Sequence, residues 1–375
     1  MDIAPFETEH FFAEYEFTTP HPLSLSDCES VSIGELLELG GSSLEEFGGL
    51  RLGYTEPLGH PELREAIAAA DPGLSVDQVM VLGSPIEGID ILCRAVLDPG
   101  DEVVVLTPCY DALRNAPEHI GKILEWPLRA VDGGWEMDLD HLDRLLARSP
   151  RLVMANFPHN PTGFQPRPDE LREVVARVER SGALLYCDEM YRGLEFGERE
   201  RLPCAATLSD RVIVLAGLSK SSGLPGLRSG WLLVSDPELR AKLENWKYYT
   251  SICPPAPSMF LAHAAFRARD ELLRRNLQIV RDNLERAQGF FARHAARFDW
   301  RPPQAGSVAL VGVDVPSATE WCHRLARGPG VLLLPGSCLG AGDDQVRFGF
   351  GRRSFGPALE ALDRELQTGA SLGGC

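Results

Sequence analysis

The sequence lacks any apolar run close to the roughly 20 residues that a membrane-spanning helix needs. Its first residues, 1–7, are acidic and do not show the basic and then apolar order of a signal peptide. The nine cysteines contain no C-x-x-C pair and are widely scattered, so we expect neither a disulfide framework nor a zinc site. These absences predict a cytoplasmic protein whose cysteines are reduced and mostly buried.

Basic charge is also scarce, since 37 Lys and Arg stand against 54 Asp and Glu and give a net charge of −17. Nucleic acids and anionic membranes are bound by clustered Lys and Arg, so neither is an expected partner. A cofactor-binding regulator would need an attached DNA-binding segment, which the short acidic N-terminus does not offer. A nicotinamide dehydrogenase is disfavoured because Gly83-Ser84-Pro85 stands where a G-x-G-x-x-G loop is needed.

Short apolar runs alternate with amphipathic helical stretches, such as 168–181, through the middle of the chain. Runs that are apolar on successive residues are typical of strands buried on both faces of a sheet. The alternation predicts an α/β/α three-layer domain around a mostly parallel mixed sheet. The six runs are 79–82, 103–106, 152–155, 184–187, 212–215 and 231–234.

The pattern changes after Pro254-Pro255. One long helical segment is predicted over about 257–297, followed by short strands that include 308–311 and 331–334. We interpret this part as a smaller α+β domain. The predicted division is a large domain over 45–256 and a small domain formed by 1–44 and 257–375. The Gly-rich stretch 40–53 is predicted to be a loop.

Lys220 is the first candidate for chemistry, because ligands of such sheets bind at the carboxyl ends of the strands and Lys220 follows the run 212–215. Burial against an apolar sheet lowers a lysine pKa, as an imine-forming lysine requires. Arg228 lies in a turn rich in Gly and Pro, where its guanidinium could bind a phosphate. A lone lysine would be interpreted as a surface group, so the assignment depends on other segments.

Three further polar residues follow predicted strands. Asp188 ends the run 184–187, where a buried carboxylate needs a cation such as a protonated pyridine nitrogen. Asn160 lies in Pro158-His159-Asn160-Pro161, and its amide could donate to a phenolate oxygen. Tyr110 follows the run 103–106 and could stack on a flat ring. Together they indicate a site for an anionic aromatic cofactor.

The ordered motifs are Asn-Pro-Thr-Gly at 160–163, Asp-Glu-Met-Tyr-Arg-Gly at 188–193, Ser-Lys at 219–220 and Gly-Leu-Arg-Ser-Gly at 226–230. From about Tyr54 to Arg347 the chain resembles the class I/II aminotransferases, which are fold-type-I enzymes that use pyridoxal 5′-phosphate (PLP). The resemblance implies an aspartate aminotransferase-like fold, PLP as cofactor and a homodimer with shared active sites.

The resemblance also implies roles for individual residues. Lys220 would form the Schiff base and carry the proton between the substrate α-carbon and the cofactor, and Arg347 would bind the substrate α-carboxylate beside Asn160. Tyr54 would reach the phosphate of the neighbouring subunit. The remaining cofactor contacts would be Asp188 to the pyridine nitrogen, Asn160 and Tyr191 to the phenolic oxygen, Tyr110 stacked on the ring, and Ser219 and Arg228 at the phosphate.

The phosphate loop departs from the family pattern. A helix N-terminus binds phosphate through its backbone N–H groups, but Pro85 has no N–H and Ile86 has no hydroxyl. Gly217 stands where the family often has a phosphate-binding serine. We therefore expect Ser84 and the N–H of Ile86 to be the remaining donors of this loop.

The segment 22–36 also departs, because it replaces a glycine-bearing segment that lies over the substrate in the family. It faintly resembles the same stretch of capreomycidine synthases, fold-type-I enzymes of antibiotic biosynthesis that do not transaminate. On that interpretation Cys28 is a candidate substrate contact. The alternative is a plain capped helix start, with Ser32 as N-cap and Glu35 three residues later.

The resemblance implies a reaction on an amino acid through an external aldimine and an α-carbanion. Transamination is the commonest outcome in the family and is our first expectation. The alternative is β-elimination, decarboxylation or cyclisation of an unusual amino acid in specialised metabolism. The sequence does not identify the substrate side chain.

Overall fold

The large sheet has eight strands in the order β2-β9-β8-β7-β6-β3-β4-β5 in the computed structural model, which describes residues 3–196 and 201–368. Strands β8, β7, β6, β3 and β4 run parallel, while β9 is antiparallel to both of its neighbours and β5 is antiparallel to β4. All six predicted runs lie in strands. The strands are β2 (Val79–Leu82), β3 (Glu102–Thr107), β4 (Lys122–Val131), β5 (Gly134–Met137), β6 (Leu152–Asn156), β7 (Leu184–Asp188), β8 (Val212–Gly217) and β9 (Gly230–Val234).

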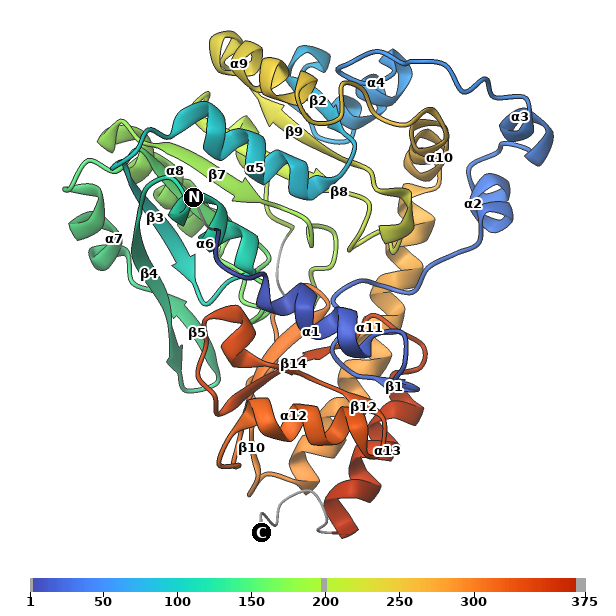
Figure 1. Ribbon diagram of the computed structural model, residues 1–375, viewed down its shortest axis with the longest axis vertical. Helices are drawn as coiled ribbons and strands as arrows, with labels where there is room; N and C mark the ends of the chain where they lie inside the picture. The colour runs from blue at the N-terminus through green and yellow to red at the C-terminus, as the bar shows by residue number, and fades with distance from the viewer. Residues whose placement is uncertain (1–2, 197–200, 369–375) are drawn as a thin grey trace.

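Helices cover both faces of this sheet, as the sequence predicted (Figure 1). Alternate strand residues enter different cores: Val79 and Val81 pack on one face, whereas Met80 and Leu82 pack on the other. Such alternation buries both faces of each central strand, which explains why the runs are apolar throughout. The helices of this part are α4 (Pro61–Ala69), α5 (Pro85–Val96), α6 (Asp111–Glu118), α7 (Leu139–Leu146), α8 (Pro168–Ser181), α9 (Pro237–Tyr248) and α10 (Ala256–Arg267).

A second, smaller sheet is antiparallel, with the order β10-β11-β14-β13. A separate apolar core joins it to the helices beside it and to α1 (Glu7–Tyr15) near the N-terminus. Strand β1 (His21–Pro22) pairs parallel with β12 (Val331–Leu332), so the segment from α1 to β1 completes this core. Its other elements are β10 (Phe298–Asp299), β11 (Val308–Val313), α12 (Ala318–Arg327), β13 (Leu334–Pro335), β14 (Gln345–Gly349) and α13 (Phe355–Thr368).

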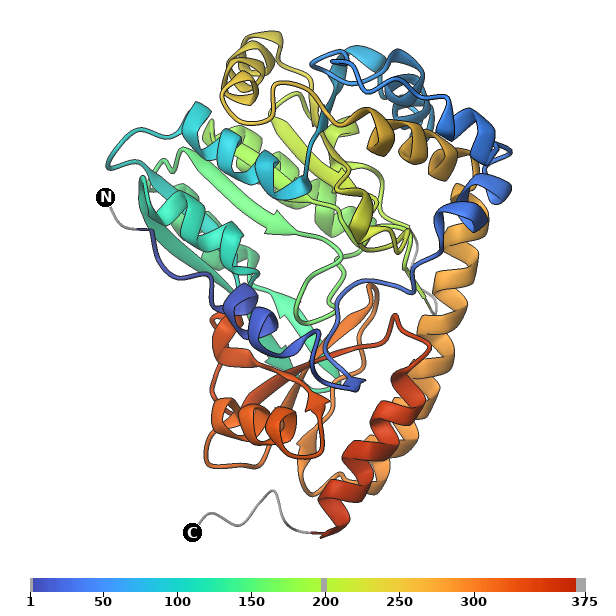
Figure 2. The same cartoon turned by 45° about the vertical axis from the view of Figure 1, so that its right-hand side comes forward.

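The helical segment predicted over 257–297 is two helices. Helix α10 ends at Arg267 and α11 (Arg269–Arg293) follows, because Ala268 leaves the helical conformation with φ −91° and ψ 5°. Figures 1 and 2 show α11 running along one side of the molecule from the level of α10 down to the small sheet. The division at 45–256 stays a prediction.

The stretch 40–53 also differs from the expected loop, because it contains the short helix α3 (Leu44–Gly48). The side chains of Ser43 and Glu46 cap this helix reciprocally, which stabilises a helix start even in a Gly-rich stretch. Helix α2 (Ile33–Leu39) precedes it and packs against α10. Among the helices of the described residues, none is long and apolar enough to cross a bilayer.

Candidate active site

A cavity of about 610 Å³ opens at the carboxyl ends of the central strands, between the large sheet and the small domain. Helix α1 lies beside it, between the two sheets (Figure 1). Most of the predicted site residues line this one cavity, although they come from segments far apart in the sequence. These are Pro85, Ile86, Tyr110, Asn160, Asp188, Tyr191, Ser219, Lys220, Arg228 and Arg347.

Lys220 follows the last residue of β8 by three positions and extends into the cavity. Its Nζ donates a hydrogen bond to Ser26 Oγ at 2.8 Å. Burial lowers the pKa of Lys220, and the nearby positive charge of Arg347 lowers it further, while Asp27, Glu9 and Asp188 oppose that shift. Since a deprotonated amine is the nucleophilic form, this environment suits imine formation.

Asp188 is the last residue of β7 and is buried. Its Oδ1 accepts a hydrogen bond from the Met190 N–H at 3.0 Å, and its carbonyl accepts one from Asn156 Nδ2 at 2.8 Å. Burial nevertheless raises the pKa of Asp188 to about 6, more than Met190 and Lys220 can offset. A cationic ring nitrogen beside this carboxylate would restore its ionised form.

Several buried polar atoms of the cavity lack a hydrogen-bond partner within the described residues. They are the Tyr191 hydroxyl, the Ser219 hydroxyl and Nε of Arg347. Arg347 is 1% exposed, and its Nη1 and Nη2 donate to Asn160 Oδ1 at 3.2 Å and to the Ser24 carbonyl at 2.9 Å. Because buried polar atoms are costly when unpaired, these residues fit a ligand that carries a phenolic oxygen, a phosphate and a carboxylate.

Comparison with known proteins agrees with this chemistry. The family profile for aminotransferase class I and II matches residues 42–362. The chain belongs to this family. It is 32% identical over 369 residues to capreomycidine synthase of Streptomyces vinaceus, covering 96% of this chain and 94% of that protein. The similarity to capreomycidine synthase, first noted in segment 22–36, therefore extends over nearly the whole chain.

Two solved structures resemble this class I/II family member over 98% of its length. One is a PLP-dependent aminotransferase from Streptococcus suis 89-1591, with a TM-score of 0.91, 26% identity and 99% of that chain covered. The other is the PLP-dependent cyclase OrfR, with a TM-score of 0.90, 29% identity and 98% of that chain covered. The predicted aspartate aminotransferase-like fold and PLP as cofactor are thereby confirmed.

At the predicted phosphate end, Arg228 adopts a left-handed conformation with φ 51°. Its Nη2 donates to Ser84 Oγ at 2.8 Å and its Nη1 donates to the Pro225 carbonyl at 3.0 Å. Ser84 is the N-cap residue of α5, and its side chain makes no capping hydrogen bond. The Ser84 hydroxyl and the Arg228 guanidinium are thus placed together at the start of α5, as an anion site requires.

The two departures in this region share one steric cause. Gly217 of β8 and Gly230 of β9 face each other in the sheet, and the Pro85 ring covers them. A Cβ at Gly230 would lie 2.7 Å from Pro85 Cγ, and one at Gly217 would lie 3.1 Å from it. A serine at position 217 would therefore crowd the proline. The serine that the family often carries at this position and the Pro85 ring would occupy the same space.

Tyr110 is the N-cap residue of α6, and its Oη donates to Glu9 Oε1 at 2.8 Å. The Phe6 ring lies 5.1 Å from the Tyr110 ring, measured between centroids. Tyr54 is 90% exposed and lies outside the cavity of this single chain. Its expected role toward a neighbouring subunit stays a prediction.

Cys28 does not line the cavity, although we expected it to contact the substrate. Its side chain is 0% exposed and belongs to the core of the small domain, where burial raises the pKa of the thiol to about 12. The preceding residues Ser26 and Asp27 line the cavity instead. The capped start at Ser32 is also present: Ser32 Oγ accepts from the Glu35 N–H at 3.2 Å, and Glu35 Oε2 accepts from the Ser32 N–H at 2.8 Å.

Sequence reasoning missed the acidic residues Glu9 and Glu16, which line the cavity with Asp27. Asp27 accepts a hydrogen bond from Arg352 at 2.6 Å. Burial raises the pKa of Glu16, and the charges of Asp27 and Glu9 raise it further. The spacing of seven between Glu9 and Glu16 was an available signal, because it corresponds to two helical turns and places both residues on one side of the N-terminal segment.

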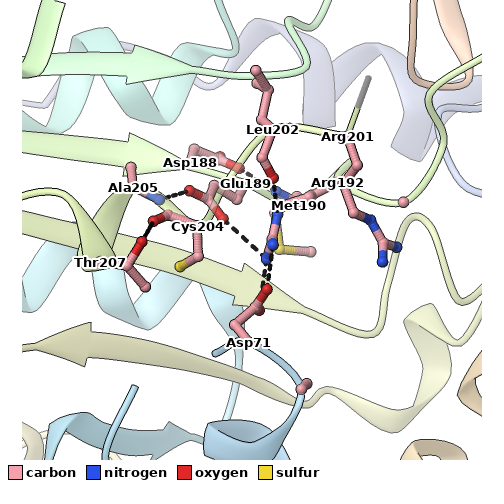
Figure 3. Close-up of polar contacts among 12 residues, drawn as sticks. Asp71, Asp188, Glu189, Met190, Arg192, Arg201, Leu202, Cys204, Ala205 and Thr207 are labelled. Atoms are coloured by element: carbon pink, nitrogen blue, oxygen red, sulfur yellow. Dashed lines mark hydrogen bonds and ion pairs between the residues drawn. The ribbon is translucent and has the colours of Figure 1, made fainter. Parts of the chain in front are cut away.

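A second group that sequence reasoning missed holds the turn after Asp188 (Figure 3). Arg192 forms a bidentate ion pair with Asp71, in which Nη1 lies 2.7 Å from Oδ2 and Nη2 donates to Oδ1. Its Nε donates to the Leu202 carbonyl at 3.0 Å. Glu189 accepts from the Ala205 N–H at 2.6 Å and lies 3.6 Å from Arg192. This network, Asp71–Arg192–Glu189, anchors the turn that carries Asp188 and Tyr191.

Proposed function

We propose that this PLP-dependent enzyme acts on an amino acid with a positively charged side chain, and that it eliminates a β-substituent and cyclises the side chain rather than transaminating. The observation that carries this proposal is the acidic lining of the cavity by Glu9, Glu16 and Asp27. The similarity to capreomycidine synthase over 96% of this chain and to the cyclase OrfR supports the choice of reaction.

The cofactor, when bound, supplies an electron sink for the negative charge that remains after the α-proton is removed. We assign Lys220 to bind the cofactor covalently and then to take the α-proton. Arg347 would bind the α-carboxylate through its guanidinium, which is already oriented by Asn160 and the Ser24 carbonyl. Tyr191 and Asn160 would contact the phenolic oxygen, and Asp188 the ring nitrogen.

The phosphate would be held by Ser84, Ser219 and Arg228, together with the N–H of Ile86. Ser84 and Arg228 already share a hydrogen bond, and the Ser219 hydroxyl is buried without a partner in the described chain. We further propose that Tyr54 of a second copy completes this end, since its own side chain is 90% exposed.

The substrate class follows from the balance of charge in the rest of the cavity. Arg352 already pairs with Asp27, whereas Glu16 has a raised pKa because it is buried near other carboxylates. A substrate ammonium or guanidinium would relieve that repulsion, and an opposite charge close to a partly buried carboxylate is favourable. Glu16 could also accept a proton from a side-chain nitrogen as that nitrogen closes a ring.

Transamination remains the second candidate, because the Streptococcus suis aminotransferase has a TM-score of 0.91 to this chain. Lys220, Asp188 and Arg347 would serve both reactions equally. The two differ in what happens to the amino group, so the products separate them.

The experiment compares arginine with citrulline, its neutral isostere, as ligands of the holoenzyme. We expect arginine to perturb the cofactor absorbance at a concentration about tenfold lower, and Glu16→Gln to remove that preference, because one charge interaction of about 1.4 kcal/mol gives a factor of ten. Equal binding of the two ligands would refute the substrate class.

The reaction is then tested with basic amino acids that carry a β-hydroxyl group, using mass spectrometry of the products. Loss of water from the substrate with the cofactor left in its aldehyde form supports elimination and cyclisation. Formation of an oxo acid with the cofactor converted to pyridoxamine phosphate would favour transamination instead.

A further inference from the structure

The N-terminal segment holds the reactive lysine at two points. Lys220 Nζ donates to Ser26 Oγ at 2.8 Å, and the Lys220 carbonyl accepts from the Cys28 N–H at 3.3 Å. Within the described residues, Nζ makes no other hydrogen bond. The hydroxyl of Ser26 is therefore the group that sets the direction of the lysine amine.

Ser26 is itself fixed by the small domain. Its carbonyl accepts a hydrogen bond from Ser307 Oγ at 2.6 Å. On either side, the Leu23 carbonyl accepts from the Gly349 N–H at 2.7 Å and the Glu29 N–H donates to the Gly351 carbonyl at 2.8 Å. A Cβ on either glycine would collide with the backbone of this segment, so the close approach requires glycine there.

The charges around Nζ act at longer range than Ser26. Asp27, Glu9 and Asp188 favour the ammonium form, and Arg347 together with burial favours the neutral amine. Glu16 feels the charge of Lys220 from the rim of the same cavity. These groups act together with Ser26 on how readily the amine is protonated, but only a directional hydrogen bond sets where its lone pair points.

We propose that Ser26 is a positioning residue for Lys220, which orients Nζ while the lysine takes the α-proton of the substrate. The inference rests on the proposed role of Lys220. In this step the α-carbon–hydrogen bond breaks, its electron pair stays on the substrate, and a new N–H bond forms on Nζ. Ser26 accepts one N–H of the neutral amine, which leaves the lone pair for the incoming proton, and then stabilises the ammonium that results.

The test uses Ser26→Ala, Ser26→Thr as the conservative variant and Ser30→Ala as the control. Ser30 lies on the same segment and is exposed. The holoenzyme is incubated with arginine in D₂O, and exchange of the α-proton is followed by NMR. We expect Ser26→Ala to lower the exchange rate about tenfold, which corresponds to about 1.4 kcal/mol and lies within the net contribution of one hydrogen bond. Ser26→Thr should recover most of the rate, and Ser30→Ala should keep it.

A second readout uses the apoprotein, so it does not depend on turnover. The pH dependence of Lys220 acetylation, followed by mass spectrometry, reports the pKa of the amine. Loss of the acceptor that stabilises the ammonium should lower the Lys220 pKa in Ser26→Ala, and a general loss of packing would not shift it in this direction. The thermal midpoint and the PLP affinity of each variant show whether the fold and cofactor site are intact.

The outcomes separate this inference from the proposed function. If Ser26→Ala exchanges the α-proton at the parent rate, or keeps the parent Lys220 pKa, the positioning role is refuted and the proposed function stands. If the parent exchanges no α-proton with any amino acid, the proposed function itself fails. A slowed Ser26→Ala with rescue by threonine supports both.

Discussion

The contact between Pro85 and Gly217 makes a quantitative prediction about cofactor binding. Gly217→Ser places a Cβ 3.1 Å from Pro85 Cγ and equally close to Sδ and Cε of Met190. This separation is several tenths of an ångström shorter than an ordinary carbon contact. The flexible Met190 can move, but the Pro85 ring is fixed at the start of α5. We therefore expect a loss of about 1–2 kcal/mol in the free energy of unfolding, at the lower end of overpacking costs.

Pro85→Ala should lower the free energy of unfolding for a different reason, because it removes the ring that packs on Gly217 and Gly230. Removing the ring leaves a small void, for which we expect a loss of about 1 kcal/mol. It also restores a backbone N–H at the start of α5. In the double variant the new serine occupies the space that the ring has left, so the two losses should not add. The expected coupling free energy is about 1 kcal/mol, within the range of residues in contact.

The cofactor affinity gives the second half of this test. If the phosphate lies at the start of α5, as we propose, a serine hydroxyl at 217 and an N–H at 85 become additional donors to it, and a hydrogen bond to a charged group contributes about 1.5–3 kcal/mol. The double variant should thus bind PLP at least tenfold more tightly than Gly217→Ser alone. The assays are urea unfolding of the apoproteins and equilibrium dialysis with PLP. Strictly additive unfolding energies, with unchanged PLP affinity in the double variant, would refute the shared steric cause.

Two further predictions concern the Asp188 turn and the dimer. Burial raises the pKa of Glu189 to about 7, so the stability that its protonated form contributes is lost as pH rises from about 4.5 to 7. Between pH 5 and 8, the free energy of unfolding of Glu189→Gln should therefore rise by roughly 2–3 kcal/mol relative to that of the parent, as measured by urea unfolding. A difference between the two proteins that does not change with pH would contradict this. Mixing inactive Tyr54→Ala with inactive Lys220→Ala should restore about a quarter of the sites if the sites are shared; no recovery after subunit exchange would contradict the shared site.

The sequence predicted the sheet and the cofactor side of the cavity for one physical reason. Strands buried on both faces are apolar at every position, so a polar residue that follows such a run stands out, as Asp188 and Lys220 do. Ligands collect at the carboxyl ends of parallel strands, so these residues were expected to meet. The part of the cavity to which we assign the cofactor is thus encoded locally, in strand ends and the turns that follow them.

The part of the cavity to which we assign the substrate could not be predicted in this way, because it depends on contacts between distant segments. Ser26 meets Lys220 across 194 positions, and Thr8 hydrogen-bonds Asp111 across 103. No local periodicity records such pairings. The position of Cys28 could not be predicted for a related reason: the chain around it packs into the small domain, so its thiol is buried while Ser26 and Asp27 line the cavity.

This separation bears on how one cofactor site can support different reactions. On the proposed assignment, Asp188, Arg228 and Arg347 bind the cofactor and the common part of any amino acid, so we expect that changing them would abolish every reaction alike. Residues of α1 and of the segment after it also line the cavity without belonging to the large sheet, and one of them, Ser26, accepts a hydrogen bond from Lys220. Substitutions there can alter which side chain is accepted and how the amine of Lys220 is directed, while the cofactor contacts stay intact. Selection for a new product should therefore act first on the N-terminal segment.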